Sequence, residues 1–175
     1  VVMAPADENE CRQMLYTAVQ HPGPTAVRYP RGGGTGVTPQ TAMQALPIGK
    51  GEILRRGRSV ALLAFGSLVT VAREVGDALD ATVANMRFVK PLDEDLIAEL
   101  AATHELLVTI EENAVIGGAG AEVARVVDGL AQRPRVLRLG LPDHFIDHGD
   151  QGQLLASVGL DKAGILASIE RARKL

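Results

Sequence analysis

The first thirty residues alternate between the apolar spacing of strands and that of a helix. Apolar residues three and four positions apart predict an amphipathic helix, with the stripe Cys11, Met14, Leu15, Ala18 and Val19. Asp7 stands three residues ahead of Glu10, which is typical of a capped helix start, and two prolines near residue 22 end the helix. Short apolar runs at 1–4 and 25–29 predict flanking strands. This β-α-β unit is too small to bury its own faces.

The remaining residues repeat the alternation more regularly. Strands are expected at 48–54, 59–65, 81–86, 105–110 and 135–139, the first two joined by a basic turn at 55–58. Helices are expected at 68–79, 93–102, 120–130, 150–156 and 161–174, with Ser67 and Asp93 as caps of the first two. Strands that alternate with helices of this length favour an α/β fold, with a mostly parallel sheet covered by helices on both faces.

A stretch rich in glycine and proline separates the two parts. Residues 30–36 contain four glycines and one proline, and a Thr/Gln/Pro-containing stretch follows to residue 47. Neither helix nor strand is favoured there. The sequence therefore predicts the end of one domain at 1–36, a linker at 37–47 and a second domain at 48–175. Because the chain begins inside a strand and without Met, we expect it to be a piece of a longer protein.

Composition narrows the class of partner. Hydrophobic residues make up 46% and charged residues 22%, so a packed core is expected. The formal net charge of −3 argues against nucleic acid or an anionic membrane as the main partner. The longest apolar block, 60–65, has the length of a strand rather than of a membrane span. The single cysteine excludes an internal disulfide, which fits a reducing, cytoplasmic compartment.

Two arginines are candidates for an anion site. Arg28 lies near the end of a predicted strand, and Arg31 lies just past it, ahead of the glycines. A guanidinium offers a forked donor to a phosphate or carboxylate, and small residues let a ligand approach the backbone. On position alone, pairing with an acidic neighbour at the surface is the simpler explanation.

Other polar clusters have structural explanations beside the chemical ones. The acidic run 7–10 suits the positive end of a helix dipole, and a carboxylate pair for acid–base work is the alternative. The glycines at 117–120 lack the spacing of a dinucleotide fingerprint, which favours a tight strand-to-helix turn. At the strand end, Glu111, Glu112 and Asn113 could meet a ligand or a neighbouring subunit, or could accept hydrogen bonds from loop amides.

The histidines, the cysteine and Ser67 complete the candidates. Two histidines and two carboxylates are spaced four residues apart, as metal ligands on a helix can be: Asp143, His144, Asp147 and His148. However, Pro142 before them and Gly149 after them leave room for only one helical turn. The other histidines, His21 and His104, are isolated and supply no third ligand, so turn capping or interface contacts are favoured for the segment 143–148. Ser67 lacks the second glycine of a nucleophile elbow, and Cys11 is interpreted as a small apolar residue. The residues supply no complete catalytic set.

Several strings in the chain resemble a known family. Residues 5–15 and 23–32, which include Arg-Tyr-Pro-Arg-Gly, are similar to the end of the pyrimidine-binding domain in the 1-deoxy-D-xylulose-5-phosphate synthase family of transketolase-like enzymes. Strings similar to the transketolase-type carboxyl-terminal domain of that family lie at 46–51, 86–93, 109–113 and 140–143. The resemblance covers nearly the whole chain.

The resemblance implies an activity for a longer parent enzyme. The family condenses pyruvate with D-glyceraldehyde 3-phosphate, releases carbon dioxide and uses thiamine diphosphate and Mg²⁺, in isoprenoid and thiamine biosynthesis. It implies that Arg28 grips the substrate phosphate, with Arg31 a weaker candidate. The cofactor and metal ligands of the family are not found in this segment, so we expect the segment alone to be inactive. Its expected partners are the upstream domains and a second copy in a bacterial cytoplasm.

Two alternatives remain open. The same fold could form a non-catalytic dimerisation or regulatory module, which would need no phosphate site. The chain could also be the β-subunit tail of a related 2-oxo-acid dehydrogenase component, although the Arg-Tyr-Pro-Arg-Gly string at 28–32 counts against this alternative.

Overall fold

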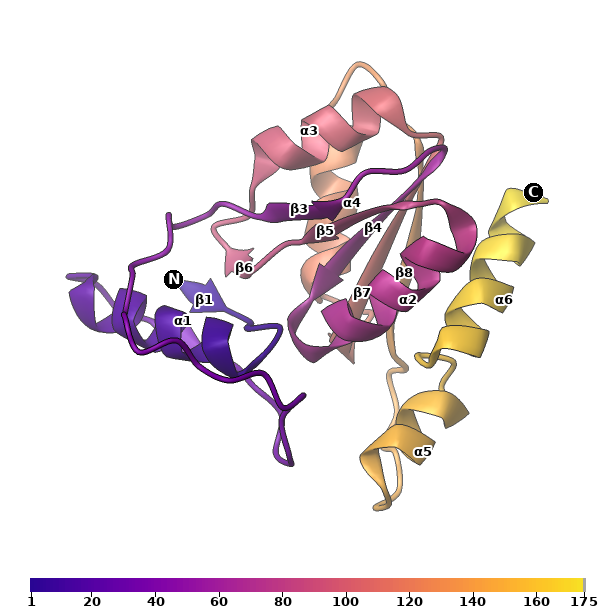
Figure 1. Cartoon of the computed structure of the whole chain (residues 1–175). Helices are drawn as coiled ribbons and strands as arrows, with labels where there is room; N and C mark the ends of the chain where they lie inside the picture. Colours follow the sequence, from indigo (N-terminus) through magenta and orange to yellow (C-terminus); the bar gives the residue numbers. More distant parts are fainter. Residues whose placement is uncertain (175) are drawn as a thin grey trace.

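A five-stranded sheet forms the centre of the molecule. The computed structural model describes residues 1–174, and Figure 1 shows their arrangement. Across the sheet the strand order is β3 (Glu52–Arg55), β5 (Thr82–Asn85), β4 (Val60–Phe65), β7 (Leu106–Ala114) and β8 (Arg135–Leu141). All neighbours are parallel except β3, which runs antiparallel to β5. The predicted mostly parallel sheet is therefore confirmed.

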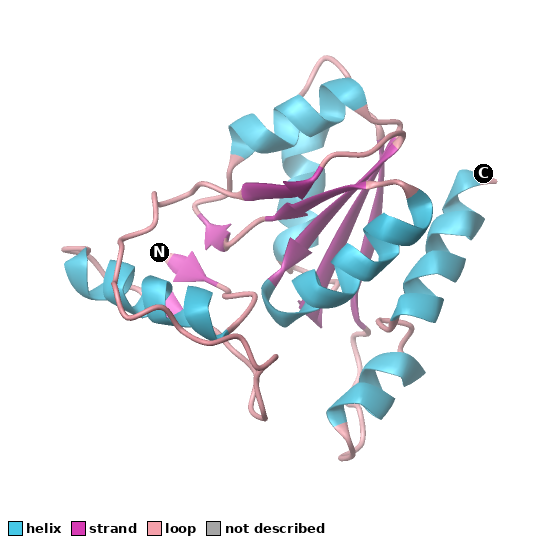
Figure 2. Cartoon of the chain, in the orientation of Figure 1, coloured by secondary structure: helices cyan, strands magenta, loops and turns pink. Residues whose placement is uncertain are grey.

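Helices cover both faces of this sheet (Figure 2). One face packs against α2 (Val69–Leu79) and α6 (Lys162–Arg173), and the other against α3 (Glu94–Thr103) and α4 (Ala119–Asp128). Successive side chains of a strand point to opposite faces. All six residues of β4 are buried because both of its faces are covered, which explains its uninterrupted apolar sequence. No helix within residues 1–174 combines the length and apolar character needed to cross a bilayer.

A second, smaller sheet combines strands from the two parts of the chain that the predicted linker separates. Its order is β2 (Ala26–Val27), β1 (Val2–Met3) and β6 (Phe88–Lys90), with β1 parallel to β2 and antiparallel to β6. Met3, Met14 and Phe88 form a small core between this sheet and α1 (Glu8–Gln20). The sequence predicts no strand at 88–90. This strand belongs by sequence to the second part of the chain and completes the sheet of the first.

The predicted inward stripe of α1 is only partly correct. Met14 is fully buried, but Leu15 is 50% exposed and Val19 is 81% exposed. The buried side of the helix is largely polar and includes Glu10, Gln13 and Thr17. Tertiary contacts therefore override the apolar pattern, because the polar side holds the linker and the apolar side lies open.

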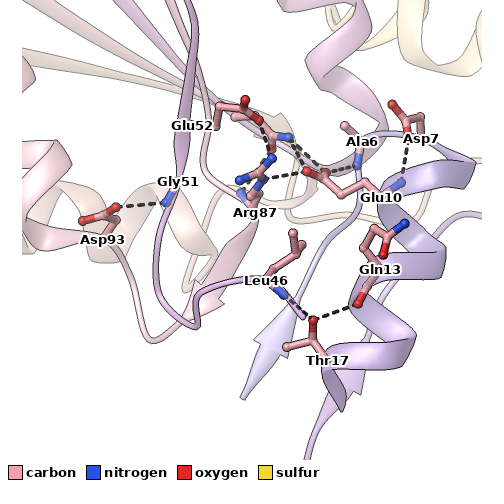
Figure 3. A network of polar contacts seen from close by, with 11 residues as sticks. Ala6, Asp7, Glu10, Gln13, Thr17, Leu46, Gly51, Glu52, Arg87 and Asp93 are labelled. Atoms are coloured by element: carbon pink, nitrogen blue, oxygen red, sulfur yellow. Dashed lines mark hydrogen bonds and ion pairs between the residues drawn. The ribbon is translucent and has the colours of Figure 1, made fainter. Parts of the chain in front are cut away.

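The linker is anchored along α1 although it contains no helix or strand. The N–H of Gln40 donates to Oδ1 of Asn9 at 2.9 Å, and the N–H of Gln44 donates to Oε1 of Gln13 at 2.6 Å. The N–H of Leu46 donates to Oγ1 of Thr17 at 2.8 Å (Figure 3). Asn9, Gln13 and Thr17 are four residues apart and share one face of the helix. Side chains here satisfy linker N–H groups that no strand would pair.

One local prediction near β4 is wrong. Ser67 does not cap α2, because Gly66–Leu68 forms a 3₁₀ turn and Leu68, without a side-chain cap, precedes the helix. The hydroxyl of Ser67 donates instead to Glu112. The basic turn at 55–58 joins two strands as predicted, but these strands are not neighbours in the sheet, since β3 pairs with β5 rather than with β4.

The predicted cap of α3 is confirmed, and it has a further role. Asp93 is only 5% exposed and accepts hydrogen bonds from the N–H of Leu96 at 3.2 Å and the N–H of Gly51 at 2.9 Å. Lys50 pairs with both Asp93 and the exposed Asp95. The carboxylate of Asp93 thereby ties the start of β3 to α3.

Replacing Asp93 with alanine is expected to lower the free energy of unfolding by about 1–2 kcal/mol, because two N–H groups lose their acceptor. Asp95→Ala removes only an exposed ion pair and is the matched control, with an expected loss of under about 1 kcal/mol. Urea unfolding of both variants measures the difference. Equal losses would show that Asp93 acts only through Lys50.

Candidate functional site

The candidate anion site lies where the carboxyl ends of β4 and β7 approach the end of β2. Arg28 follows β2, and its N–H donates to the carbonyl of Met3 at 2.8 Å, which continues the pairing with β1. A small cavity of about 60 Å³ lies between these elements. It is lined by Ala4, Arg28, Tyr29, Pro30, Phe65, Gly66, Ser67 and Glu112. Ligands of open α/β sheets bind at this end of the strands.

Glu112 is the hub of the polar contacts around the cavity. Its carbonyl oxygen accepts a hydrogen bond from Nη2 of Arg28 at 2.6 Å. One carboxylate oxygen accepts from Oγ of Ser67 at 2.8 Å, and the other accepts from Nε2 of Gln151 at 3.0 Å. Gln151 begins α5 (Gln151–Ser157). Segments 39 to 84 residues away from Glu112 in sequence thus meet at this one residue.

The two predicted arginines differ in what they contact. Arg28 is exposed, donates to the Glu112 carbonyl and lies near enough to Glu111 for its positive charge to oppose, in small part, the rise in the pKa of that carboxyl that burial causes. Arg31 is exposed, and its side chain makes no hydrogen bond or ion pair with the residues that the structure describes. The structure therefore places Arg28 in the lining of the cavity, with one guanidinium nitrogen already hydrogen-bonded to Glu112. Arg31 lies outside the cavity lining, on the loop that follows.

The loop that carries Arg31 is anchored at its far end by Glu8. The carboxylate of Glu8 accepts from Oγ1 of Thr35 at 2.8 Å and from the N–H of Gly36 at 2.7 Å. Hydrogen bonds from its own N–H, from Gly36 and from Thr35 lower the pKa of Glu8 to about 2. We call residues 28–36 the arginine loop; it is held by Glu112 at one end and by Glu8 at the other.

Glu111 has the structural role that the sequence left as one of two alternatives. It is 4% exposed and accepts from the N–H groups of Ala119 at 2.8 Å and Gly120 at 2.7 Å, at the start of α4. Burial raises the pKa of the Glu111 carboxyl, and these two N–H groups act in the opposite direction. A Cβ on Gly118 would lie 2.6 Å from both Glu111 carboxylate oxygens, so the glycines form a tight packing turn.

Comparison with known proteins places these features in a family. The family described as "Transketolase, C-terminal domain" matches residues 49–165. The chain belongs to the transketolase C-terminal domain family. Its β4, β7 and α4 lie within the matched range, whereas the arginine loop precedes it.

Curated relatives extend the match to nearly the whole chain. The chain is 81% identical over 170 residues to the "1-deoxy-D-xylulose-5-phosphate synthase" of Azoarcus sp. (strain BH72), covering 97% of this chain and 28% of that protein. It is 65% identical to the protein of the same name from Dechloromonas aromatica (strain RCB), again with 28% of the relative covered. The resemblance stated from the sequence is confirmed. The chain spans little more than a quarter of the length of these relatives.

Solved structures share the fold. A "Split gene transketolase, inactive beta4 tetramer" aligns with a TM-score of 0.87 and 30% identity, over 99% of this chain and 58% of that chain. A transketolase from Campylobacter jejuni aligns with a TM-score of 0.64 at 16% identity, over 97% of this chain and 26% of that chain. The second shows the fold alone.

The remaining candidates of this transketolase-family chain do not assemble into a second site. The segment that contains Asp143, His144, Asp147 and His148 is neither helix nor strand, so these side chains do not share a helical face. Among residues 1–174, no three His, Cys, Asp or Glu side chains are grouped so that they could hold a metal ion.

Asp7 caps α1 by accepting a hydrogen bond from the N–H of Glu10 at 2.8 Å. Burial raises the pKa of the Cys11 thiol.

A wider groove of about 750 Å³ lies beside the arginine loop. It is bounded by the open side of α1, by Tyr29, Pro30 and residues 32–35, and by Met43, Ser67 and Gln151. Leu15, Val19 and Tyr29 are large apolar side chains that remain exposed in it. Sequence reasoning missed this groove because it expected Leu15 and Val19 to be buried.

Proposed function

We propose that the chain is the carboxyl-terminal part of a 1-deoxy-D-xylulose-5-phosphate synthase, which condenses pyruvate with D-glyceraldehyde 3-phosphate and releases carbon dioxide. The observation that carries this proposal is the 81% identity over 97% of the chain to a relative of that name. The Arg-Tyr-Pro-Arg-Gly string at 28–32, whose first three residues line the cavity, supports a site for a phosphorylated substrate.

In this family thiamine diphosphate supplies the carbanion chemistry, and the protein binds and orients the substrates. The described residues do not fit a Mg²⁺ site, since no suitable group of ligands is present in 1–174. The proposal therefore assigns no cofactor step to this segment. The segment's part is to bind the aldehyde phosphate, and alone it is expected to be inactive.

The two arginines divide this task in our proposal. Arg31 takes the phosphate, because its guanidinium is exposed and has no partner within residues 1–174. Arg28 supports the start of the loop through the Glu112 carbonyl and contributes positive charge. A phosphate bound at Arg28 itself would lie close to the carboxylates of Glu111 and Glu112, which would repel it. Our proposal thus prefers Arg31 to Arg28 for the phosphate, which is the reverse of the order that the resemblance implied.

The rest of the enzyme and a second copy are the proposed partners. The exposed apolar side of α1 supports this proposal, because an apolar face of that kind is normally covered. The parent enzyme is proposed to be a homodimer of the bacterial cytoplasm.

The test is an assay of the full-length enzyme that contains this segment. Purified enzyme supplied with pyruvate, D-glyceraldehyde 3-phosphate, thiamine diphosphate and Mg²⁺ is expected to form 1-deoxy-D-xylulose 5-phosphate and one equivalent of carbon dioxide. Residues 1–175 alone serve as the inactive control. A full-length enzyme that forms no such product would overturn the proposal and favour a non-catalytic module.

A further inference from the structure

We infer that Glu112 is a positioning residue that orients the arginine loop toward the substrate phosphate. This inference rests on the proposed function, because the loop acts on a phosphorylated aldehyde only if that function holds. The inference assigns Glu112 no contact with the substrate itself. It acts through the residues at the two sides of Arg31.

On one side of Arg31, the main chain of Glu112 fixes Arg28. The 2.6 Å hydrogen bond from Nη2 of Arg28 to the Glu112 carbonyl joins the loop to the end of β7. A hydrogen bond with a charged partner is stronger than a neutral one. Because Arg28 is only three residues before Arg31, this bond limits the directions in which the loop can leave β2.

On the other side of Arg31, the carboxylate of Glu112 fixes Gln151. Nε2 of Gln151 donates to Glu112 at 3.0 Å, and the side-chain oxygen of Gln151 lies against Gly32. A Cβ added to Gly32 would be 3.5 Å from that oxygen, which is ordinary contact distance. Gly32 directly follows Arg31. The Glu112 carboxylate thus fixes the position of the Gln151 side chain, against which the loop packs at Gly32.

Strand β7 is irregular around Glu112, and this irregularity changes the direction of the side chain. The pairing of β7 with β8 shifts register between Ile110 and Ala114, and Glu112 lies within the shifted stretch. Such irregularities commonly redirect a side chain beside a functional site. Glu111 is committed to α4 on one side, which leaves Glu112 directed toward Ser67 and Gln151.

The decisive experiment compares two aldehydes in the full-length enzyme. Glu112→Ala is expected to raise the KM for D-glyceraldehyde 3-phosphate about fivefold to tenfold, since a small misplacement of a binding group weakens the productive complex. The KM for unphosphorylated D-glyceraldehyde is expected to stay unchanged, because that aldehyde has no phosphate for Arg31 to bind. Gln151→Ala should shift the same ratio in the same direction. Glu112→Gln should restore most of the wild-type ratio, because an amide can still bond Ser67 and Gln151.

Glu105→Gln is the matched control, since Glu105 is exposed just before the opposite end of the same strand. A double variant, Arg31→Ala with Glu112→Ala, should be no worse than Arg31→Ala alone, because Glu112 acts through that loop. Additive effects, or equal KM changes for both aldehydes, would overturn the inference.

Should Glu112→Ala fail to fold, Gln151→Ala at an exposed position tests the inference by the same ratio of KM values. If wild-type enzyme makes no product, the proposed function falls and this inference with it; if it does, only the inference is at stake.

Discussion

In the full-length enzyme, Arg31→Ala is expected to raise the KM for D-glyceraldehyde 3-phosphate about 10- to 100-fold. That range corresponds to about 1.5–3 kcal/mol, the contribution of a hydrogen bond to a charged group. Arg31→Lys should fall between wild type and alanine, because an ammonium keeps the charge but loses the forked geometry. Steady-state kinetics with the aldehyde varied at saturating pyruvate measures the effect.

Arg58→Ala is the matched control, because the Arg58 side chain is 90% exposed on the remote turn at 55–58 and has only a 4.0 Å contact with Asp80. Arg28→Ala should raise the KM for D-glyceraldehyde 3-phosphate less than Arg31→Ala does, and should leave the KM for unphosphorylated D-glyceraldehyde unchanged, because Arg28 acts through the loop. The opposite ranking, with Arg28 dominant, would return the phosphate to Arg28. An unchanged KM in both variants would remove the phosphate site from this segment.

The sequence predicted the large α/β part well because its pattern there is local. The uninterrupted apolar run of β4 and the apolar stripe of α2 each reflect the sheet face or helix face that packs in the core. The Asp93 cap was also visible, since the residues involved are three apart. These signals need no knowledge of the rest of the chain.

The errors arise where contacts between distant residues decide the structure. Ser67 has the right position for a cap, but Glu112, 45 residues away, takes its hydroxyl. The apolar stripe of α1 faces the open groove because the linker and Arg87 occupy the polar side. The two arginines could be named from the sequence, because they lie in one short string. The contacts of Glu112 could not, because they join segments that are far apart in the sequence and leave no local pattern.

The buried ion pair between Glu10 and Arg87 connects the first part of the chain to the second (Figure 3). Glu10 is 8% exposed, and its carboxylate accepts from Nε of Arg87 at 2.7 Å, from Nδ2 of Asn85 at 3.0 Å and from the N–H of Ala6 at 2.8 Å. Arg87 also pairs with Glu52. The backbone of Arg87 has a φ of 58°, in the left-handed region that non-glycine residues seldom adopt. The network therefore stabilises an otherwise costly turn before β6.

Glu10→Ala is expected to lower the free energy of unfolding by about 1–3 kcal/mol, because it leaves the buried Asn85 amide without its acceptor and the partly buried Arg87 guanidinium with only the exposed Glu52. Urea unfolding of the purified protein measures this loss. Glu52→Ala is the matched control: it removes the other carboxylate on Arg87, but Glu52 is 48% exposed, so the expected loss is under about 1 kcal/mol. Hydrogen exchange should show lost protection at β1 and β6 in Glu10→Ala, with β4 and β7 still protected. Equal losses for the two variants, or uniform loss of protection, would mean that the pair does not specifically hold the two parts together.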